Sequence, residues 1–235
     1  MTKFHKKLLL FGGTGQIGLA VADKFSNENW QVCAVVRNPS PDIPMAFRWD
    51  VLLDAMMPDK LSLAGPFDAI CWAQGANLND SIYSFDQSNH LALYEINVLY
   101  ILRALSMLLK NEMLIKPAKI CIVSSIWQEI SRQNKLSYAV SKSALKGLVL
   151  SLANDLAQDG HLVNAVLPGA LDTPMTRKNL SEEQIKLIEQ ATKFKRLPDL
   201  SDVASTIYFL CSDENSGVTG QFLKIDLGFS DVRNI

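Results

Sequence analysis

The sequence predicts an α/β protein built on a doubly wound parallel sheet, with helices packed on both faces. Short apolar runs of strand length alternate along the 235 residues with longer runs that have helical spacing. A glycine-rich turn at residues 12–18 separates the first strand-like run from the first helical run. A chain of this length fits one α/β domain, so a single domain over residues 1–235 is expected.

The predicted strands are short runs rich in apolar and β-branched residues. Continuous apolar runs of this length are typical of parallel strands, which are buried on both faces. Because such strands are joined by right-handed crossovers, we expect a ligand crevice at their carboxyl ends. The predicted strands cover residues 7–11, 32–36, 46–50, 69–73, 120–124 and 163–167.

The predicted helices fill the intervals between these strands. Residues 17–27 follow the glycine-rich turn with apolar side chains at helical spacing, and long helical patterns cover residues 91–111 and 137–157. Residues 181–190 have the pattern of a short amphipathic helix after the sixth strand. A helix inserted there could close over a substrate.

Charge and composition argue against several classes of function. The 23 basic and 24 acidic residues give a net charge of -1 and are interspersed, which predicts no surface for nucleic acid or anionic membrane. The apolar stretch 98–109 is interrupted by Arg103 and is too short to cross a bilayer. The first apolar run ends at Gly12 and Gly13, too early for a signal peptide. The four cysteines are widely spaced and are expected to be reduced, which predicts a cytoplasmic protein.

Sequence patterns for metal binding and hydrolysis are missing. His5, His90 and His161 have no ligand-like spacing with cysteines or carboxylates, so no metal is expected. The sequence also contains no GxSxG elbow, no GxxxxGK[ST] loop and no CxxC pair.

Tyr138 and Lys142 form the most informative pair in the chain. Positions four apart share one face of a helix, so the Lys142 ammonium is expected beside the Tyr138 phenol. A phenol has a pKa near ~10, and a neighbouring cation favours the phenolate, which brings the group closer to acid-base work at neutral pH. Ser125 lies thirteen residues before Tyr138, after the fifth predicted strand. Each residue alone fits a surface or capping role, whereas the joint spacing favours a carbonyl reductase.

The glycine-rich turn has the placement that a dinucleotide phosphate site requires. Glycines let backbone amides approach a pyrophosphate, and the N-terminus of the following helix favours its negative charge. For this segment alone, a tight turn without a ligand remains the alternative.

The ordered set of motifs resembles the single-domain branch of the short-chain dehydrogenase/reductase family over nearly the whole chain. In that branch a TGxxxGxG turn, an NNAG segment, an Asn, a Ser, a YxxxK pair and a PG turn occur in this order. The corresponding positions are residues 12–18, Trp72-Ala73-Gln74-Gly75, Asn97, Ser125, Tyr138 with Lys142, Pro168-Gly169, and a closing run 218–221 followed by Asp226. The resemblance implies a Rossmann-like sheet of about seven strands, in the order 3-2-1-4-5-6-7, within a three-layer αβα sandwich.

The resemblance also implies a catalytic tetrad. Tyr138 would exchange a proton with the substrate oxygen, and Lys142 would hold the nicotinamide ribose and lower the pKa of Tyr138. Ser125 would donate a hydrogen bond to the carbonyl oxygen, and Asn97 would position a water in a proton relay.

The end of the second predicted strand favours NADP(H) over NAD(H). An acidic residue there would bind the ribose hydroxyls of NAD and repel a 2′-phosphate, but this chain has Arg37. A guanidinium makes charge-assisted contacts to phosphate, although a solvated loop arginine is the alternative. The residues expected to contact the cofactor are Gly12, Thr14, Gly15, Gln16, Ile17, Gly18, Arg37, Asp50, Val51, Ala73, Gly75, Asn97, Tyr138, Lys142, Pro168, Gly169 and Thr173.

Substrate specificity is expected from two variable segments. One is the loop after Ser125, with Ile126, Trp127 and Ile130, and the other covers residues 171–190. These side chains are mainly apolar, which predicts an apolar substrate or an acyl thioester. The residues expected to contact the substrate are Ser125, Trp127, Tyr138 and Met175.

Two departures from the family pattern keep other functions open. Gln16 replaces a glycine, and the remaining GxxGxxG spacing resembles the extended branch of sugar-nucleotide epimerases and dehydratases. The segment 72–75 lacks the asparagines of NNAG. The predicted function is an NADP(H)-dependent reductase of a ketone, an aldehyde or an acyl thioester, or a dehydrogenase of the matching alcohol. The alternatives are a catalytically idle NADP(H)-binding regulatory module and an extended-type sugar-nucleotide enzyme.

Two long helical segments predict an assembly. Residues 91–111 and 145–156 carry more apolar surface than one sheet face requires, and members of the similar family pair through these helices. A homotetramer or homodimer is therefore expected.

Overall fold

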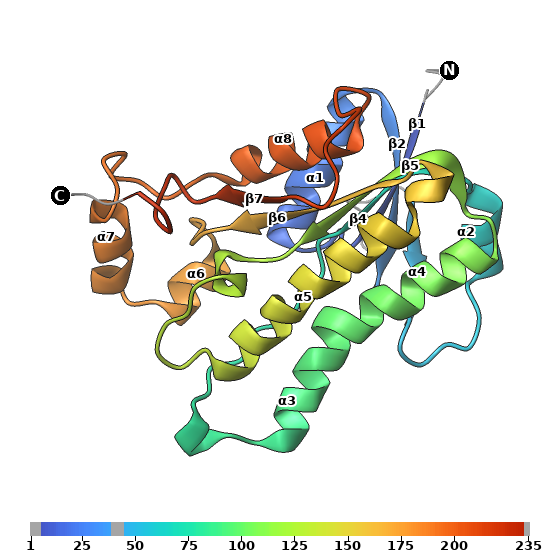
Figure 1. Ribbon diagram of the computed structural model, residues 1–235. Coiled ribbons are helices and arrows are strands. Elements are labelled where there is room, and N and C mark those ends of the chain that lie inside the picture. Colours follow the sequence, from blue (N-terminus) through green and yellow to red (C-terminus); the bar gives the residue numbers. More distant parts are fainter. Residues whose placement is uncertain (1–5, 39–44, 233–235) are drawn as a thin grey trace.

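A computed structural model describes residues 6–38 and 45–232, in which a seven-stranded parallel sheet lies between two layers of helices (Figure 1). The strand order β3-β2-β1-β4-β5-β6-β7 confirms the predicted order. The strands are β1 (Lys6–Phe11), β2 (Trp30–Val36), β3 (Ala46–Arg48), β4 (Phe67–Trp72), β5 (Leu114–Val123), β6 (Leu162–Pro168) and β7 (Phe222–Ile225). The helices are α1 (Gln16–Asn27), α2 (Asp59–Ala64), α3 (Gln87–Tyr94), α4 (Tyr100–Lys110), α5 (Leu136–Asp155), α6 (Pro174–Asn179), α7 (Glu182–Gln190) and α8 (Leu200–Cys211).

The side chains of β1 alternate between the two faces of the sheet. Leu8 and Leu10 join a buried cluster with α1 and α8, whereas Leu9 and Phe11 join a larger cluster with α4 and α5. Successive strand residues point to opposite faces, so one continuously apolar strand contributes to both cores. Figure 1 shows the same division, with α1 and α8 on one side of the sheet and α4 and α5 on the other.

The helix predicted over residues 91–111 is interrupted. α3 ends at Tyr94, and Glu95–Leu99 forms a π-helical turn before α4 begins. The backbone N–H of Tyr100 reaches the carbonyl of Glu95, five residues back, which inserts one residue into the α-helical ladder. Apolar spacing continues through this segment, so the sequence pattern does not reveal the insertion.

α4 has the apolar stripe of a core helix. Ile101, Ala104, Leu105 and Leu108 are buried in it and pack against the sheet. The continuous helical stretch Gln87–Lys110 is, by length and composition, apolar enough to cross a membrane, with 39% of its most apolar window buried. Core helices of globular proteins pass the same test, and this stripe is buried in that manner.

The switch in strand order lies between β1 and β4. β1 pairs with β2 on one side and with β4 on the other, so the chain winds outward in both directions from this border. Ligands of such sheets bind outside the carboxyl ends of the strands at this point. The segments that follow β1, β4, β5 and β6 therefore meet along one edge.

Candidate active site

Tyr138 and Lys142 lie on the face of α5 that points toward β5. The Lys142 Nζ lies 5.8 Å from the centre of the Tyr138 ring and donates a hydrogen bond of 3.2 Å to the carbonyl of Val123, the last residue of β5. Lys142 is buried, and Tyr138 is half-buried. The structure thus brings the two residues together as their spacing predicts.

Ser125 reaches the Tyr138 phenol from the end of β5. It precedes the 3₁₀ turn Ile126–Gln128, where its Oγ accepts a 3.3 Å hydrogen bond from the Trp127 backbone N–H. Its hydroxyl also makes a hydrogen bond with Tyr138, which lowers the pKa of that phenol. A substrate oxygen placed near both hydroxyls would receive two hydrogen bonds.

Burial dominates the titration of Tyr138 and Lys142. It raises the pKa of Tyr138 above its ordinary value despite the Ser125 hydrogen bond, and it lowers the pKa of Lys142 to about 8. The sequence predicts that Lys142 lowers the pKa of Tyr138, and the net shift in the structure has the opposite sign because desolvation penalises the phenolate. Tyr138 is therefore held protonated at neutral pH.

Asn97 ties the loop after β4 to α5. Its Oδ1 accepts 2.8 Å from the Ala76 N–H, and its Nδ2 donates to the Ala76 carbonyl at 3.2 Å and to Ser141 Oγ at 3.0 Å. A Cβ on Gly75 would lie 3.3 Å from Asn97 Oδ1 and 3.6 Å from Lys142 Nζ. The absence of a side chain on Gly75 therefore keeps open the space above Lys142.

A second lysine, which the sequence motifs do not predict, lies beside Tyr138. The buried Lys135 Nζ is 5.2 Å from the centre of the Tyr138 ring and donates to Asn77 Oδ1 at 2.5 Å and Asn79 Oδ1 at 2.6 Å. Burial, and then the charge of Arg132, lower its pKa to about 8. Lys135 sits just before α5, outside the four-residue spacing that identified Lys142.

The loop between β4 and α3 is fastened to the start of α5. Asp80 accepts hydrogen bonds from the Ser137 backbone N–H at 2.9 Å and from the Ser137 hydroxyl. The Ser137 hydroxyl also lies 2.8 Å from His90 Nδ1. Because Ser137 precedes Tyr138, these contacts fix the first turn of the helix that carries the phenol.

The glycine-rich turn has the geometry of an anion site. Gly12 has a φ of +78°, and a Cβ there would lie 2.6 Å from the Gln74 backbone nitrogen. Gly15 is the N-cap of α1 without a side-chain cap, and Thr14, Gly15 and Gln16 are exposed. The first backbone N–H groups of α1 are thus available to an anion. A Cβ on Gly18 would lie 2.2 Å from the Gly12 carbonyl oxygen, and Ile17 packs against the core.

A cavity of about 540 Å³ adjoins this turn. Arg37 and Asp50, which are predicted to contact the cofactor, line it, and Arg48 does so as well. The register that pairs Val36 with Arg48 places the end of β3 beside the end of β2, so the strand order was the signal that could have identified Arg48. The side chain of Val51 is fully buried in the core. The cavity is lined by Thr14, Arg37, Asn38, Arg48 and Asp50.

The remaining predicted positions lie along the same edge. Pro168 ends β6, and a Cβ on Gly169 would lie 2.8 Å from the Asp226 Cβ. Thr173 caps α6 and accepts from the Thr176 N–H at 3.2 Å. Ala73 is half-buried after β4. The Met175 side chain and His5 lie outside the described residues. Among the described residues, no group of three or more metal-ligating side chains occurs.

Comparison with known proteins places the chain in a family. Residues 53–230 match the family described as "Enoyl-(Acyl carrier protein) reductase". A 3alpha-hydroxysteroid dehydrogenase of Mediterraneibacter gnavus is 27% identical over 243 residues, covering 94% of this chain and 96% of the relative.

Solved structures share this fold. A short chain dehydrogenase family protein of Francisella tularensis superposes with a TM-score of 0.82 at 25% identity, covering 96% of this chain and 98% of that one. The structure of ElxO with NADP bound has a TM-score of 0.82 at 24% identity and covers 97% and 99% of the two chains. The chain therefore belongs to the short-chain dehydrogenase/reductase family of oxidoreductases.

Proposed function

We propose that the protein is an NADP(H)-dependent reductase of a ketone or aldehyde, or a dehydrogenase of the matching alcohol, with Tyr138 as proton donor. The observation that carries this proposal is the Ser125–Tyr138 hydrogen bond beside Lys142, at the edge where the strands end. The raised pKa of Tyr138 favours a protonated phenol, which suits the reductive direction.

Each residue of the tetrad has a separate task in this proposal. The nicotinamide, when bound, supplies the hydride. Tyr138 gives its proton to the carbonyl oxygen, and Ser125 donates a hydrogen bond to the same oxygen as negative charge develops there. Lys142 binds the ribose in the space beside Gly75. The amide of Asn97 is bonded to Ala76 and Ser141, so its task is to hold this loop against α5.

Two arginines support NADP(H) as the preferred cofactor. Arg37 and Arg48 are exposed and line the cavity beside the glycine-rich turn. No described carboxylate forms an ion pair with either guanidinium within 4.0 Å, and both are suited to a 2′-phosphate. Asp50, the carboxylate in the lining, accepts a 3.2 Å hydrogen bond from the Leu52 N–H.

The decisive experiment measures oxidation of NADPH, with NADH in parallel, across ketones, aldehydes, quinones and acyl thioesters. We expect turnover with NADPH that Tyr138→Phe reduces by about 10³-fold or more, since the substrate loses its proton donor. Tyr208→Phe is the matched control, because Tyr208 lies on α8 across the sheet. Tight NADPH binding without turnover would instead support a regulatory binding module, and turnover of a UDP-sugar would support the extended-type enzyme.

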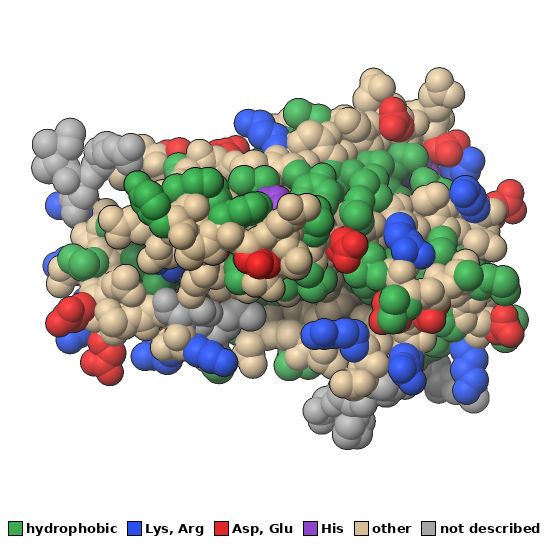
Figure 2. All heavy atoms as spheres, turned by 90° about the horizontal axis from the view of Figure 1, so that it is seen from below, with side chains coloured by type: hydrophobic (Ala, Val, Ile, Leu, Met, Phe, Trp, Pro, Cys, Tyr) green, Lys and Arg blue, Asp and Glu red, His purple; other side chains and the backbone are tan. Residues whose placement is uncertain are grey.

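We further propose a single cytoplasmic domain that assembles into a homotetramer or homodimer through α4 and α5. Large apolar side chains are exposed on both helices, among them Leu102, 40% exposed, and Leu150, 49% exposed. Figure 2 shows apolar side chains gathered in a band across the face seen from below, the side on which α3 and α4 lie in Figure 1. Patches of this kind commonly mark protein interfaces.

A further inference from the structure

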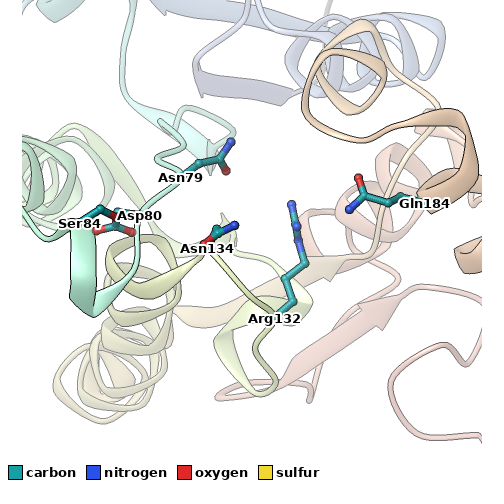
Figure 3. Close-up of a pocket in the computed structure, with 6 residues that line it drawn as sticks. All are labelled: Asn79, Asp80, Ser84, Arg132, Asn134 and Gln184. Carbon is teal, nitrogen blue, oxygen red and sulfur yellow. The ribbon is translucent and has the colours of Figure 1, made fainter.

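A second cavity, of about 370 Å³, has a polar lining, and its lining residue Asp80 is bonded to Ser137, the neighbour of Tyr138. It is formed by the loop after β4, the loop between β5 and α5, and α7. Figure 3 shows Arg132 extending into the space between Asn134 and Gln184. The lining residues are Asn79, Asp80, Ser84, Arg132, Asn134 and Gln184.

The Arg132 guanidinium is held by a ring contact and has no counterion among the described residues. Its Cζ lies 5.9 Å from the centre of the Trp127 ring, a cation-π contact. Trp127 is in turn bonded through its backbone N–H to Ser125. No described carboxylate lies within ion-pair distance of Arg132. The guanidinium is therefore oriented by the turn that follows Ser125.

The charges around this cavity favour an anion. Lys135 makes hydrogen bonds to two neutral amides, Asn77 and Asn79, and the charge of Arg132 contributes to its lowered pKa of about 8. Asp80 is the carboxylate of the lining, but it is buried and bonded to Ser137. Arg132 thus lines the cavity and Lys135 is bonded to the lining residue Asn79, against one buried carboxylate that is already bonded.

We propose that this cavity binds an oxoanion of the substrate, so that the carbonyl compound is a small hydrophilic molecule carrying a carboxylate or phosphate, with Arg132 as its counterion. A guanidinium donates two parallel hydrogen bonds to such groups, and the amides of Asn79, Asn134 and Gln184 supply further donors. This inference rests on the proposed function, since it takes the carbonyl to lie at Tyr138.

Several of the apolar side chains that predicted an apolar substrate are committed to the core in the part of the chain that the structure describes. Ile126 and Leu171 are buried in the two core clusters, at 1% and 6% exposure. Ile130 packs against the same core as Ile126. Trp127 contributes by positioning Arg132.

Matched pairs of substrates test the proposal. Each pair has one anionic and one neutral member: acetoacetate with methyl acetoacetate, and dihydroxyacetone phosphate with dihydroxyacetone. We expect kcat/KM to favour the anion of at least one pair, which also distinguishes carboxylate from phosphate. Arg132→Ala should lower kcat/KM for that anion by about 100-fold, mainly through KM, with little effect on its neutral partner. Arg132→Lys should retain part of the preference.

The control is Lys186→Gln, which removes an exposed cation on α7 two residues beyond Gln184. It should leave the ratio of kcat/KM between the anionic and neutral substrates unchanged. An Arg132→Ala enzyme with the same anion-to-neutral ratio as the native protein would overturn the proposal. So would a native preference for the neutral members or for a neutral acetoacetyl thioester.

A binding measurement separates failure of the subsite from failure of the proposed function. If native protein binds NADPH but reduces none of these compounds and none of the wider panel, the reductase proposal fails on its own. The subsite is then tested by calorimetric titration of acetoacetate and of dihydroxyacetone phosphate into the complex with NADP⁺. Binding that is lost in Arg132→Ala would support the anion site, and absent or unchanged binding would overturn it.

Discussion

At the scale of residues, the buried charge of Lys142 lowers the stability of the folded protein at the site where we propose that it acts. Its ammonium is buried and donates a hydrogen bond to the neutral backbone carbonyl of Val123. Burial without a carboxylate lowers the pKa of Lys142 from 10.5 to about 8, a cost of about 3 kcal/mol to the charged folded state. A ribose or phosphate that binds nearby offsets part of this cost.

We therefore expect Lys142→Met to raise the melting temperature while removing turnover. The folded pKa is depressed, so the unfolded chain binds more protons between about pH 8 and pH 10.5, and native stability rises with pH in that window. The increase in melting temperature of Lys142→Met over the native protein should be largest near about pH 7, where Lys142 is charged in the folded protein. It should become smaller toward about pH 10. Calorimetric melting at both pH values measures this difference.

Lys146→Met, one turn further along α5 at an exposed position, is the control. It should show no such pH-dependent gain. Equal stability of Lys142→Met and native protein at every pH would mean that burial imposes no penalty on Lys142.

The site residues that spacing predicted share short sequence separations. Tyr138 and Lys142 are four apart on one helix, and a helix fixes their relation before the fold is known. The sequence does not predict Arg48 and Lys135, because the residues that position them are distant in the sequence. Arg48 is placed by the β2–β3 register, and Lys135 by its hydrogen bonds to Asn77 and Asn79. Their role depends on tertiary placement, which local periodicity does not encode.

At the scale of elements, the start of α5 is positioned by the loop after β4. Asp80 bonds the backbone and hydroxyl of Ser137, and the Leu136 N–H donates to the Asp80 carbonyl at 3.3 Å. Asp80 thus acts as a capping group supplied by a distant segment, in place of the N-cap residue, which lacks a side-chain cap. The position of Tyr138 therefore depends on the hydrogen bonds between Asp80 and Ser137.

Asp80→Ala should lower both the free energy of unfolding and kcat. Two hydrogen bonds to a buried carboxylate are lost, which costs about 2–3 kcal/mol, and the first turn of α5 is released. Urea denaturation and steady-state kinetics measure the two effects.

The control is Asp86→Ala, which removes the cap that Asp86 provides to the Asn89 N–H in α3 at 2.8 Å. It should lower the free energy of unfolding by about 1 kcal/mol with kcat preserved. Equal losses of kcat in both variants would show that Asp80 has no positioning role.

The helix that carries Tyr138 and Lys142, predicted over residues 137–157, is observed as Leu136–Asp155, and most strands lie as close to their predicted ranges. β1, β2 and β6 follow apolar runs that fill both cores, so composition identifies them. The third strand ends at Arg48, short of the predicted residue 50, because Trp49 leaves the sheet to enter the core. α8 was not anticipated as an element, although it packs with α1 over one face of the sheet.

At the scale of the whole molecule, the face formed by α4 and α5 predicts the assembly. We expect light scattering to give a dimer or tetramer, and Leu150→Lys to shift it toward monomer because a charge at a buried interface loses hydration. Leu187→Lys, an equally apolar and 66% exposed position on α7, is the control and should leave the mass unchanged. A monomeric native protein would contradict the predicted assembly.

The π-helical turn at Glu95–Leu99 limits how this molecule can vary in length. Asn97 within the turn faces the loop after β4, whereas Ile101 and Leu105 beyond it face the core. Deleting one residue of the turn would restore a regular helix and rotate everything after it by about 100°. Such a deletion would displace either the Asn97 amide from the loop after β4 or the apolar side chains of α4 from the core. Functional sequences that retain both contacts are therefore expected to tolerate substitution in this turn but not the loss of a single residue.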